Sequence, residues 1–166
     1  MLNRSVLSIR EQRREGFPCN FKHADFWIDG QRLYDSILRL YPNMDDIACL
    51  GFGSEAFQNK QIDKLLLNVV ADFPDDRRAL YICPACGDLG CGAVSLRIKQ
   101  EEGMVVWYDF GIESEGDSNP RVTSLPEIGP FFFEEETYAE TIRATYGLDG
   151  FHWPKADSDY NEEAEV

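Results

Sequence analysis

The sequence predicts an α+β fold in which an antiparallel sheet of four to six strands carries about three packed helices. Two observations predict this class. Residues 79–110 contain apolar, alternating segments joined by short turns, which is typical of an antiparallel meander. Segments around Leu33, Ile62 and Tyr138 instead repeat apolar residues at intervals of three and four, as helices do. The 166 residues suit one domain, which we place at 1–154, followed by an acidic tail at 155–166 that we expect to be disordered.

The first third of the chain predicts two strands and a helix. Residues 5–9 alternate, and residues 25–28 lead into the pair Asp29-Gly30, a favoured hairpin turn. From Leu33 the apolar spacing becomes helical, and Pro42 ends that helix.

The middle third predicts a strand, a helix and a hairpin. Residues 46–50 form a short apolar strand, and we expect a helix that begins near Asn59 and continues to Val70. Residues 79–83 should pair antiparallel with residues 91–98, and residues 104–110 should add a third strand.

The last third predicts a loop and a helix. Residues 113–130 are rich in Gly, Pro, Ser and acids, and residues 131–133 form a short strand or an apolar plug. Three glutamates at 134–136 open a helix, because carboxylates favour the positive end of the helix dipole. Its buried stripe is expected to consist of Tyr138, Ile142 and Tyr146.

Net charge is the largest compositional signal. The chain has a net charge of −14, and residues 101–166 alone carry seventeen Asp and Glu against three Lys and Arg. Such a field repels nucleic-acid phosphates and anionic membranes and attracts basic partners. We therefore expect no nucleic-acid or membrane partner. Solubility alone is the other explanation of the charge.

Cysteine usage and the absence of long apolar runs predict a cytoplasmic protein. No run approaches the roughly 18 apolar residues of a membrane span, and the N-terminal residues lack the apolar core of a secretory signal. The five cysteines are odd in number and three of them are clustered, which fits thiols or a metal site better than disulfides.

The clustered cysteines lie in the run CPACGDLGCG at residues 83–92. Cys83, Cys86 and Cys91 are candidate zinc ligands, since a Cys-x-x-Cys-Gly turn points two thiolates at one place. A second Cys-x-x-Cys is missing, so the fourth ligand stays open. The alternative, a glycine-rich hairpin loop with half-buried thiols, needs no further ligand, and we favour it. We therefore expect no cofactor, with zinc as the alternative.

Other catalytic patterns are weaker. A redox role for Cys83 and Cys86 would need a helix to follow them, which the glycines oppose, and no spacing supports a pair between Cys91 and His152. Residues 51–56 match G-x-G-x-x-A, but the expected helix start near Asn59 is misplaced for a dinucleotide fingerprint. We expect no nicotinamide or flavin binding and no catalytic residue.

The cysteine segment resembles a group of small, poorly characterised bacterial proteins that share a CPxCGDLGCGA core. The matching runs are YICPACGDLGCGAVSLRI, VVWYDFG and GPFFFEEETY, and the wider similarity spans about residues 24–146. Some members of that group carry a generic oxidoreductase label, but the resemblance implies no particular catalytic residue. By size and acidity alone, the chain also resembles immunity proteins of bacterial toxin systems, including contact-dependent growth inhibition.

The function that these observations favour is binding of a basic protein, as an immunity protein that blocks the active site of a nuclease toxin. Carboxylates would meet the cationic groups that grip phosphate, and aromatic side chains would supply the desolvated centre. The candidate partner-binding residues are Glu113, Glu115, Asp117, Glu134, Glu135, Glu136, Phe132 and Trp153. A zinc- or thiol-dependent protein centred on the cysteine loop is the alternative.

Overall fold

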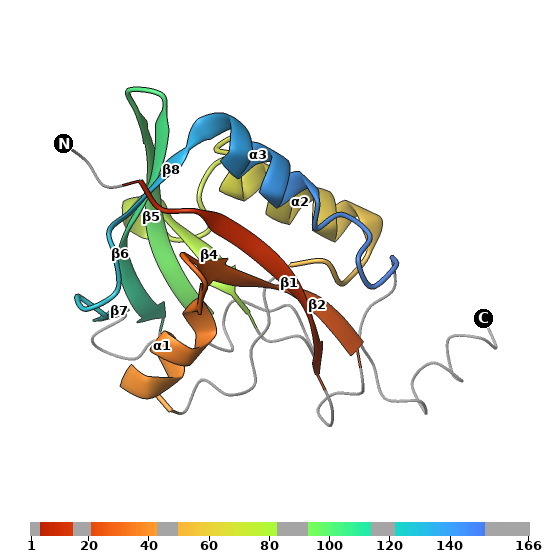
Figure 1. Ribbon diagram of the computed structural model, residues 1–166, viewed down its shortest axis with the longest axis horizontal. Coiled ribbons are helices and arrows are strands. Elements are labelled where there is room, and N and C mark those ends of the chain that lie inside the picture. Colours follow the sequence, from red (N-terminus) through yellow and green to blue (C-terminus); the bar gives the residue numbers. More distant parts are fainter. Residues whose placement is uncertain (1–3, 15–20, 43–49, 83–92, 114–121, 152–166) are drawn as a thin grey trace.

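The computed structural model describes residues 4–14, 21–42, 50–82, 93–113 and 122–151 (Figure 1). The chain order of its elements is β1 (Leu7–Arg14), β2 (Phe21–Ile28), β3 (Gln31–Arg32), α1 (Leu33–Leu40), α2 (Glu55–Leu65), a 3₁₀ turn η1 (Pro74–Asp76), β4 (Arg77–Tyr81), β5 (Ala93–Glu101), β6 (Met104–Glu113), β7 (Val122–Ser124), β8 (Phe131–Glu134) and α3 (Glu135–Arg143). No helix in the described ranges is long and apolar enough to cross a membrane.

The strands form two antiparallel sheets. One has the order β1-β2-β3, and the other runs β4-β5-β6-β7 with β8 also paired to β6. A parallel bridge between Arg4 and Phe132 joins the sheets, with the Ser5 N–H donating to the Phe132 carbonyl at 2.7 Å. The predicted α+β class is confirmed. The five-stranded sheet has the expected size, and the N-terminal strands form a second sheet.

Two hairpins have the turn geometry that their turn residues favour. Asp29 and Gly30 both have positive φ, 52° and 81°, and Glu102 and Gly103 repeat this geometry between β5 and β6. Two successive residues with positive φ match the twist of antiparallel strands. The predicted antiparallel pairing of β4 with β5 is confirmed, as is a third strand, β6.

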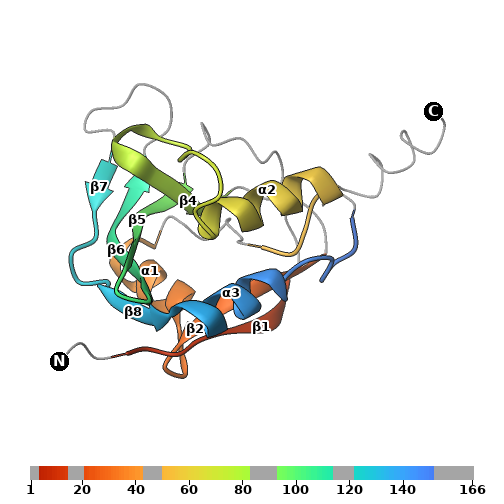
Figure 2. The ribbon, with the colours of Figure 1, turned by 90° about the horizontal axis from the view of Figure 1, so that it is seen from above.

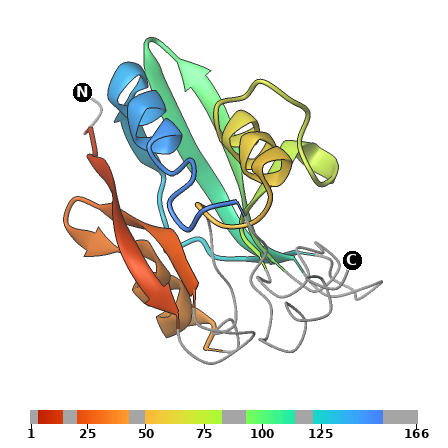
Figure 3. The ribbon, with the colours of Figure 1, turned by 90° about the vertical axis from the view of Figure 1, so that its right-hand side faces the viewer.

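The core lies between the two sheets and the helices. Trp107 is fully buried and meets Phe26, Phe133 and Tyr138 edge-on at centroid distances of 5.3, 5.1 and 5.9 Å. These rings come from β6, β2, β8 and α3. Figures 1 and 2 show α2 beside α3, and Figure 3 shows α1 packed against the three-stranded sheet away from them.

Helix α2 begins and ends earlier than predicted. Ser54 is its N-cap and accepts the Phe57 N–H at 3.1 Å, so the helix begins at Glu55 rather than near Asn59. It ends at Leu65, because Leu67 takes a positive φ of 63° that turns the chain away. Val70, expected in its apolar face, is 88% exposed.

Helix α3 begins where predicted, with Glu134 as its N-cap. Tyr138 and Ile142 are buried as expected, but Tyr146 lies beyond the helix end and is 41% exposed. Its hydroxyl donates to Glu55 Oε1. Among the other expected segments, residues 131–133 are a strand, since they lie in β8. The predicted strand at 46–50 lies outside the described residues except for Leu50, which bridges Ala24. The tail at 155–166 also lies outside the described residues.

Candidate functional site

The turn between β5 and β6 meets the start of α3, and this places five glutamates at one edge of the molecule. Met104 pairs with Glu134 across the sheet, and the Glu135 N–H donates to the Gly103 carbonyl at 3.2 Å. The exposed Glu101 and Glu102 of the turn therefore lie next to the helix start. We call this set, Glu101, Glu102, Glu134, Glu135 and Glu136, the acidic edge.

The five carboxylates of the acidic edge are not equivalent. Glu134 accepts the N–H groups of Thr137 at 3.1 Å and Glu136 at 3.3 Å. Its hydrogen bonds to Thr137 are the main cause of its lowered pKa. Glu101 pairs with Lys99 at 3.6 Å. Within the described residues, Glu102 and Glu136 have no ion pair, so their charge is the most available to a partner.

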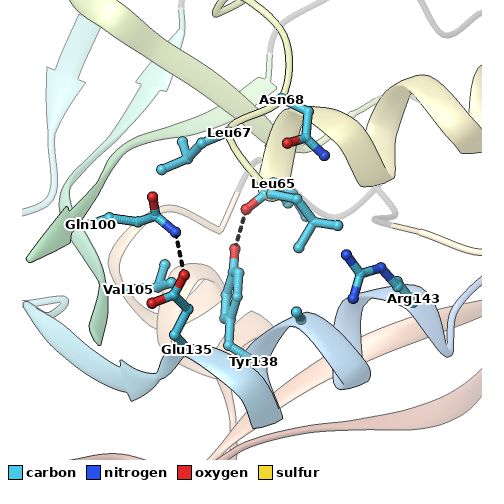
Figure 4. Close-up of a pocket in the computed structure, with 10 residues that line it drawn as sticks. Leu65, Leu67, Asn68, Gln100, Val105, Glu135, Tyr138 and Arg143 are labelled. Atoms are coloured by element: carbon cyan, nitrogen blue, oxygen red, sulfur yellow. Dashed lines mark hydrogen bonds between the residues drawn. The ribbon is translucent and has the colours of Figure 1, made fainter. Parts of the chain in front are cut away.

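A pocket of about 200 Å³ opens beside the acidic edge (Figure 4). We call it the α2–α3 pocket. Leu65, Leu66 and Leu67 form one wall and Val105 contributes from β6. In Figure 4, Glu135 and Arg143 project from α3 on either side of Tyr138.

Polar contacts fix one end of this pocket. Gln100 donates its Nε2–H to Glu135 Oε1 at 2.9 Å, which orients the carboxylate at the rim. Tyr138 donates its hydroxyl to the Leu65 carbonyl at 2.6 Å and accepts the Trp107 indole N–H at 3.0 Å. The pocket wall is thereby tied to the core.

A second hollow continues the first one along the two helices. It shares Leu66, Asn68 and Arg143 with the α2–α3 pocket and extends toward Asp63 and Tyr146. Arg143 is exposed and, within the described residues, forms no ion pair. It therefore places a positive charge between the two hollows.

Glu113 is not at the surface, which corrects its assignment to an exposed binding loop. It is the last residue of β6 and is 2% exposed. Its Oε2 accepts the Ser95 hydroxyl at 2.6 Å and lies 3.2 Å from Arg77 Nε. Arg77 also pairs with Asp109 at 3.0 Å. The buried carboxylate balances a buried guanidinium, so Glu113 is not available to a partner.

The remaining predicted residues divide into two groups. Phe132 is half-buried in β8, where it pairs with Val106, so it is more a sheet residue than a free aromatic anchor. Six others lie outside the described residues, namely Glu115, Asp117, Trp153, Cys83, Cys86 and Cys91. The described residues hold no group of three or more metal-ligating side chains, and the cysteine site stays a prediction.

The G-x-G-x-x-A run packs against the segment after α3. A Cβ at Gly51 would lie 3.0 Å from Leu148 Cβ and 3.2 Å from the Thr145 carbonyl oxygen. Helix α2 begins within the run, at Glu55, so the argument from a late helix start is wrong. Leu50, directly before the run, nevertheless bridges Ala24 of β2 antiparallel, while the next strand, β4, lies in the other sheet. The described residues therefore do not form the parallel βαβ unit that a dinucleotide fingerprint needs.

Sequence reasoning missed the part of the acidic edge that comes from the β5–β6 turn, and it missed the pocket. The available signal was the pair Glu101-Glu102 at a predicted turn, but its proximity to residue 134 depends on the pairing of β8 with β6. Comparison with protein-family models, curated proteins and solved structures finds no match to this chain.

Proposed function

We propose that this is a binding protein that docks a basic protein through the acidic edge. Its partner, in this proposal, is a nuclease toxin that it neutralises by covering the phosphate-binding cleft. The observation that carries the proposal is the meeting of two acidic segments, residues 101–102 and 134–136, on one edge. A nuclease cleft must be basic to hold phosphate, and complementary potential steers association.

These carboxylates would have different roles in docking. Glu102 and Glu136 are exposed and would meet the cations of the partner directly. Glu134 already accepts two backbone N–H groups of its own helix, so its main role is to start α3 and hold the neighbouring glutamates in place. Docking would exclude the substrate by occupying the cleft and would involve no chemical step.

Co-expression tests this proposal. Each gene adjacent to this one in the source genome is expressed alone and together with this protein in a sensitive host. We expect one product to be a basic protein that stops growth and degrades nucleic acid, and co-expression to restore both growth and intact nucleic acid. If no adjacent product is toxic, or if toxicity persists although the two proteins are both present, the immunity proposal fails.

A further inference from the structure

We propose that the α2–α3 pocket takes one arginine or lysine side chain of the basic partner. The alkyl stem would lie against the leucine wall and the charged head against Glu135. This inference rests on the proposed function, because it names the contact that anchors the partner. It adds a defined pocket to an otherwise diffuse electrostatic attraction.

The electrostatics of the pocket favour a cation at the Glu135 end. The hydrogen bond from Gln100 holds the Glu135 carboxylate at the rim. The carbonyls at the end of α2 add little to this, because the Leu65 carbonyl already accepts the Tyr138 hydroxyl and the Lys64 carbonyl accepts a hydrogen bond from the buried Arg78 guanidinium. The Glu135 carboxylate therefore gives this end its negative potential.

The walls suit the stem of a basic side chain. Leu65, Leu66 and Leu67 present apolar surface, and long basic side chains bury their methylene groups along such surface while the charged head stays at a polar rim. A volume of about 200 Å³ accommodates one side chain rather than a segment of chain. Arginine seated in a partly enclosed pocket is also a common source of binding energy in interfaces.

Arg143 sets the direction in which that side chain lies. It is eight residues after Glu135 on α3, which corresponds to about 12 Å along a helix axis. Its positive charge repels a cation at the far rim. The head of the bound side chain therefore has its lowest energy at the Glu135 end.

A small probe tests the pocket without the partner. N-acetyl-arginine amide is titrated into ¹⁵N-labelled full-length protein at low salt and followed by two-dimensional NMR. We expect saturable shifts of amides in residues 65–68 and 135–143 and near Gln100. N-acetyl-citrulline amide has nearly the same shape but no charge, and we expect it to bind up to about fivefold more weakly, the loss that one charge pair at an exposed site accounts for.

Matched variants locate the site. Glu135→Gln keeps an acceptor for Gln100 but removes the charge, and it should weaken the arginine probe about as much as the citrulline change does. Glu140→Gln alters an exposed glutamate of the same helix that belongs neither to the acidic edge nor to the pocket lining, and it should have little effect. Ala139→Leu fills the pocket and should abolish the localised shifts, whereas Ala144→Leu on the exposed face after α3 should preserve them.

Three results would overturn the inference: equal binding of the two probes, equal effects of Glu135→Gln and Glu140→Gln, or probe shifts spread over all surface carboxylates. Amide spectra of the variants establish that each is folded. The proposed function fails separately. If co-expression reveals no basic partner while the probe binds as expected, the pocket is real but the immunity proposal is wrong. If a partner binds and the probe does not, only the pocket inference is wrong.

Discussion

Tyr138→Phe removes the hydroxyl that ties the wall of the α2–α3 pocket to the core. That hydroxyl accepts the Trp107 indole N–H at 3.0 Å and donates to the Leu65 carbonyl at 2.6 Å. Phenylalanine keeps the ring, which stacks on Phe133 at a centroid distance of 5.7 Å. The substitution therefore leaves the packing almost unchanged and removes two hydrogen bonds.

The expected loss follows from the two groups left behind. A buried donor or acceptor without a partner costs about 1–3 kcal/mol. The Trp107 N–H is fully buried, whereas Leu65 lines a pocket that admits water, so its carbonyl is at the low end of that range. We expect Tyr138→Phe to lower the free energy of unfolding by about 2–4 kcal/mol. In a domain of this size, that corresponds to a fall in Tm of roughly 4–16 °C.

Tyr146→Phe is the matched control. It is the same substitution shortly after the end of the same helix, but Tyr146 is exposed and its partner Glu55 is also exposed. We expect a change within about 0.5 kcal/mol, as for an ordinary surface substitution. Urea unfolding followed by circular dichroism measures both variants. Equal shifts for the two variants, or a loss below about 1 kcal/mol for Tyr138→Phe, would refute the bridging role of this hydroxyl.

Three further predictions concern buried and capping charges. Tyr81→Phe removes the hydroxyl that donates to the fully buried Asp25 carboxylate at 2.9 Å. We expect the free energy of unfolding in urea to fall by about 1.5–3 kcal/mol, and no change would mean that the Asp25 carboxylate does not need this hydrogen bond. Lys64→Met leaves the Asp72 carboxylate buried without its ammonium partner at 2.7 Å and should cost about 3–5 kcal/mol in urea unfolding. Adding Asp72→Leu should restore part of this loss, because it removes the unpaired charge but also the acceptor of the Ala79 N–H; an additive double variant would contradict this coupling. Hydrogen bonds from Thr137 lower the pKa of Glu134 in the folded protein. The ionised carboxylate therefore stabilises the fold at pH values above its unfolded-state pKa, and this stabilisation is lost as the pH falls through its folded-state pKa. Glu134→Gln should therefore lower Tm at pH 7 and have little effect at low pH, and thermal unfolding at several pH values would show a constant difference if the cap is not ionic.

Local sequence signals predicted most of the fold. The pairs Asp29-Gly30 and Glu102-Gly103 set two hairpins through their positive φ angles, and a turn signal of this kind depends on two neighbouring residues only. The start of α3 was equally readable, because the three glutamates at 134–136 suit the positive end of a helix dipole.

Contacts between distant residues set the limits of prediction. The sequence predicts Glu113 to be part of an acidic loop. In the structure it is buried, where it pairs with Arg77, thirty-six residues earlier in the chain. Val70 continues the apolar spacing of α2, but the positive φ at Leu67 ends the helix before it. A leucine gives no sequence signal for such a backbone turn. Only residues 134–136 of the acidic edge were predicted. Glu101 and Glu102 come close to residue 134 only through the pairing of β8 with β6.

Association kinetics test the central claim, docking through the acidic edge, most directly. The basic partner identified by co-expression is mixed with this protein in a stopped-flow instrument over a range of sodium chloride concentrations. Glu136→Lys is compared with Glu127→Lys, an exposed glutamate outside the acidic edge whose reversal changes the net charge equally. We predict an association rate that falls about tenfold or more from low to physiological salt, as electrostatic steering requires, and a rate that Glu136→Lys lowers much more than Glu127→Lys. A rate that is independent of salt, or equal effects of the two reversals, would contradict docking through the acidic edge.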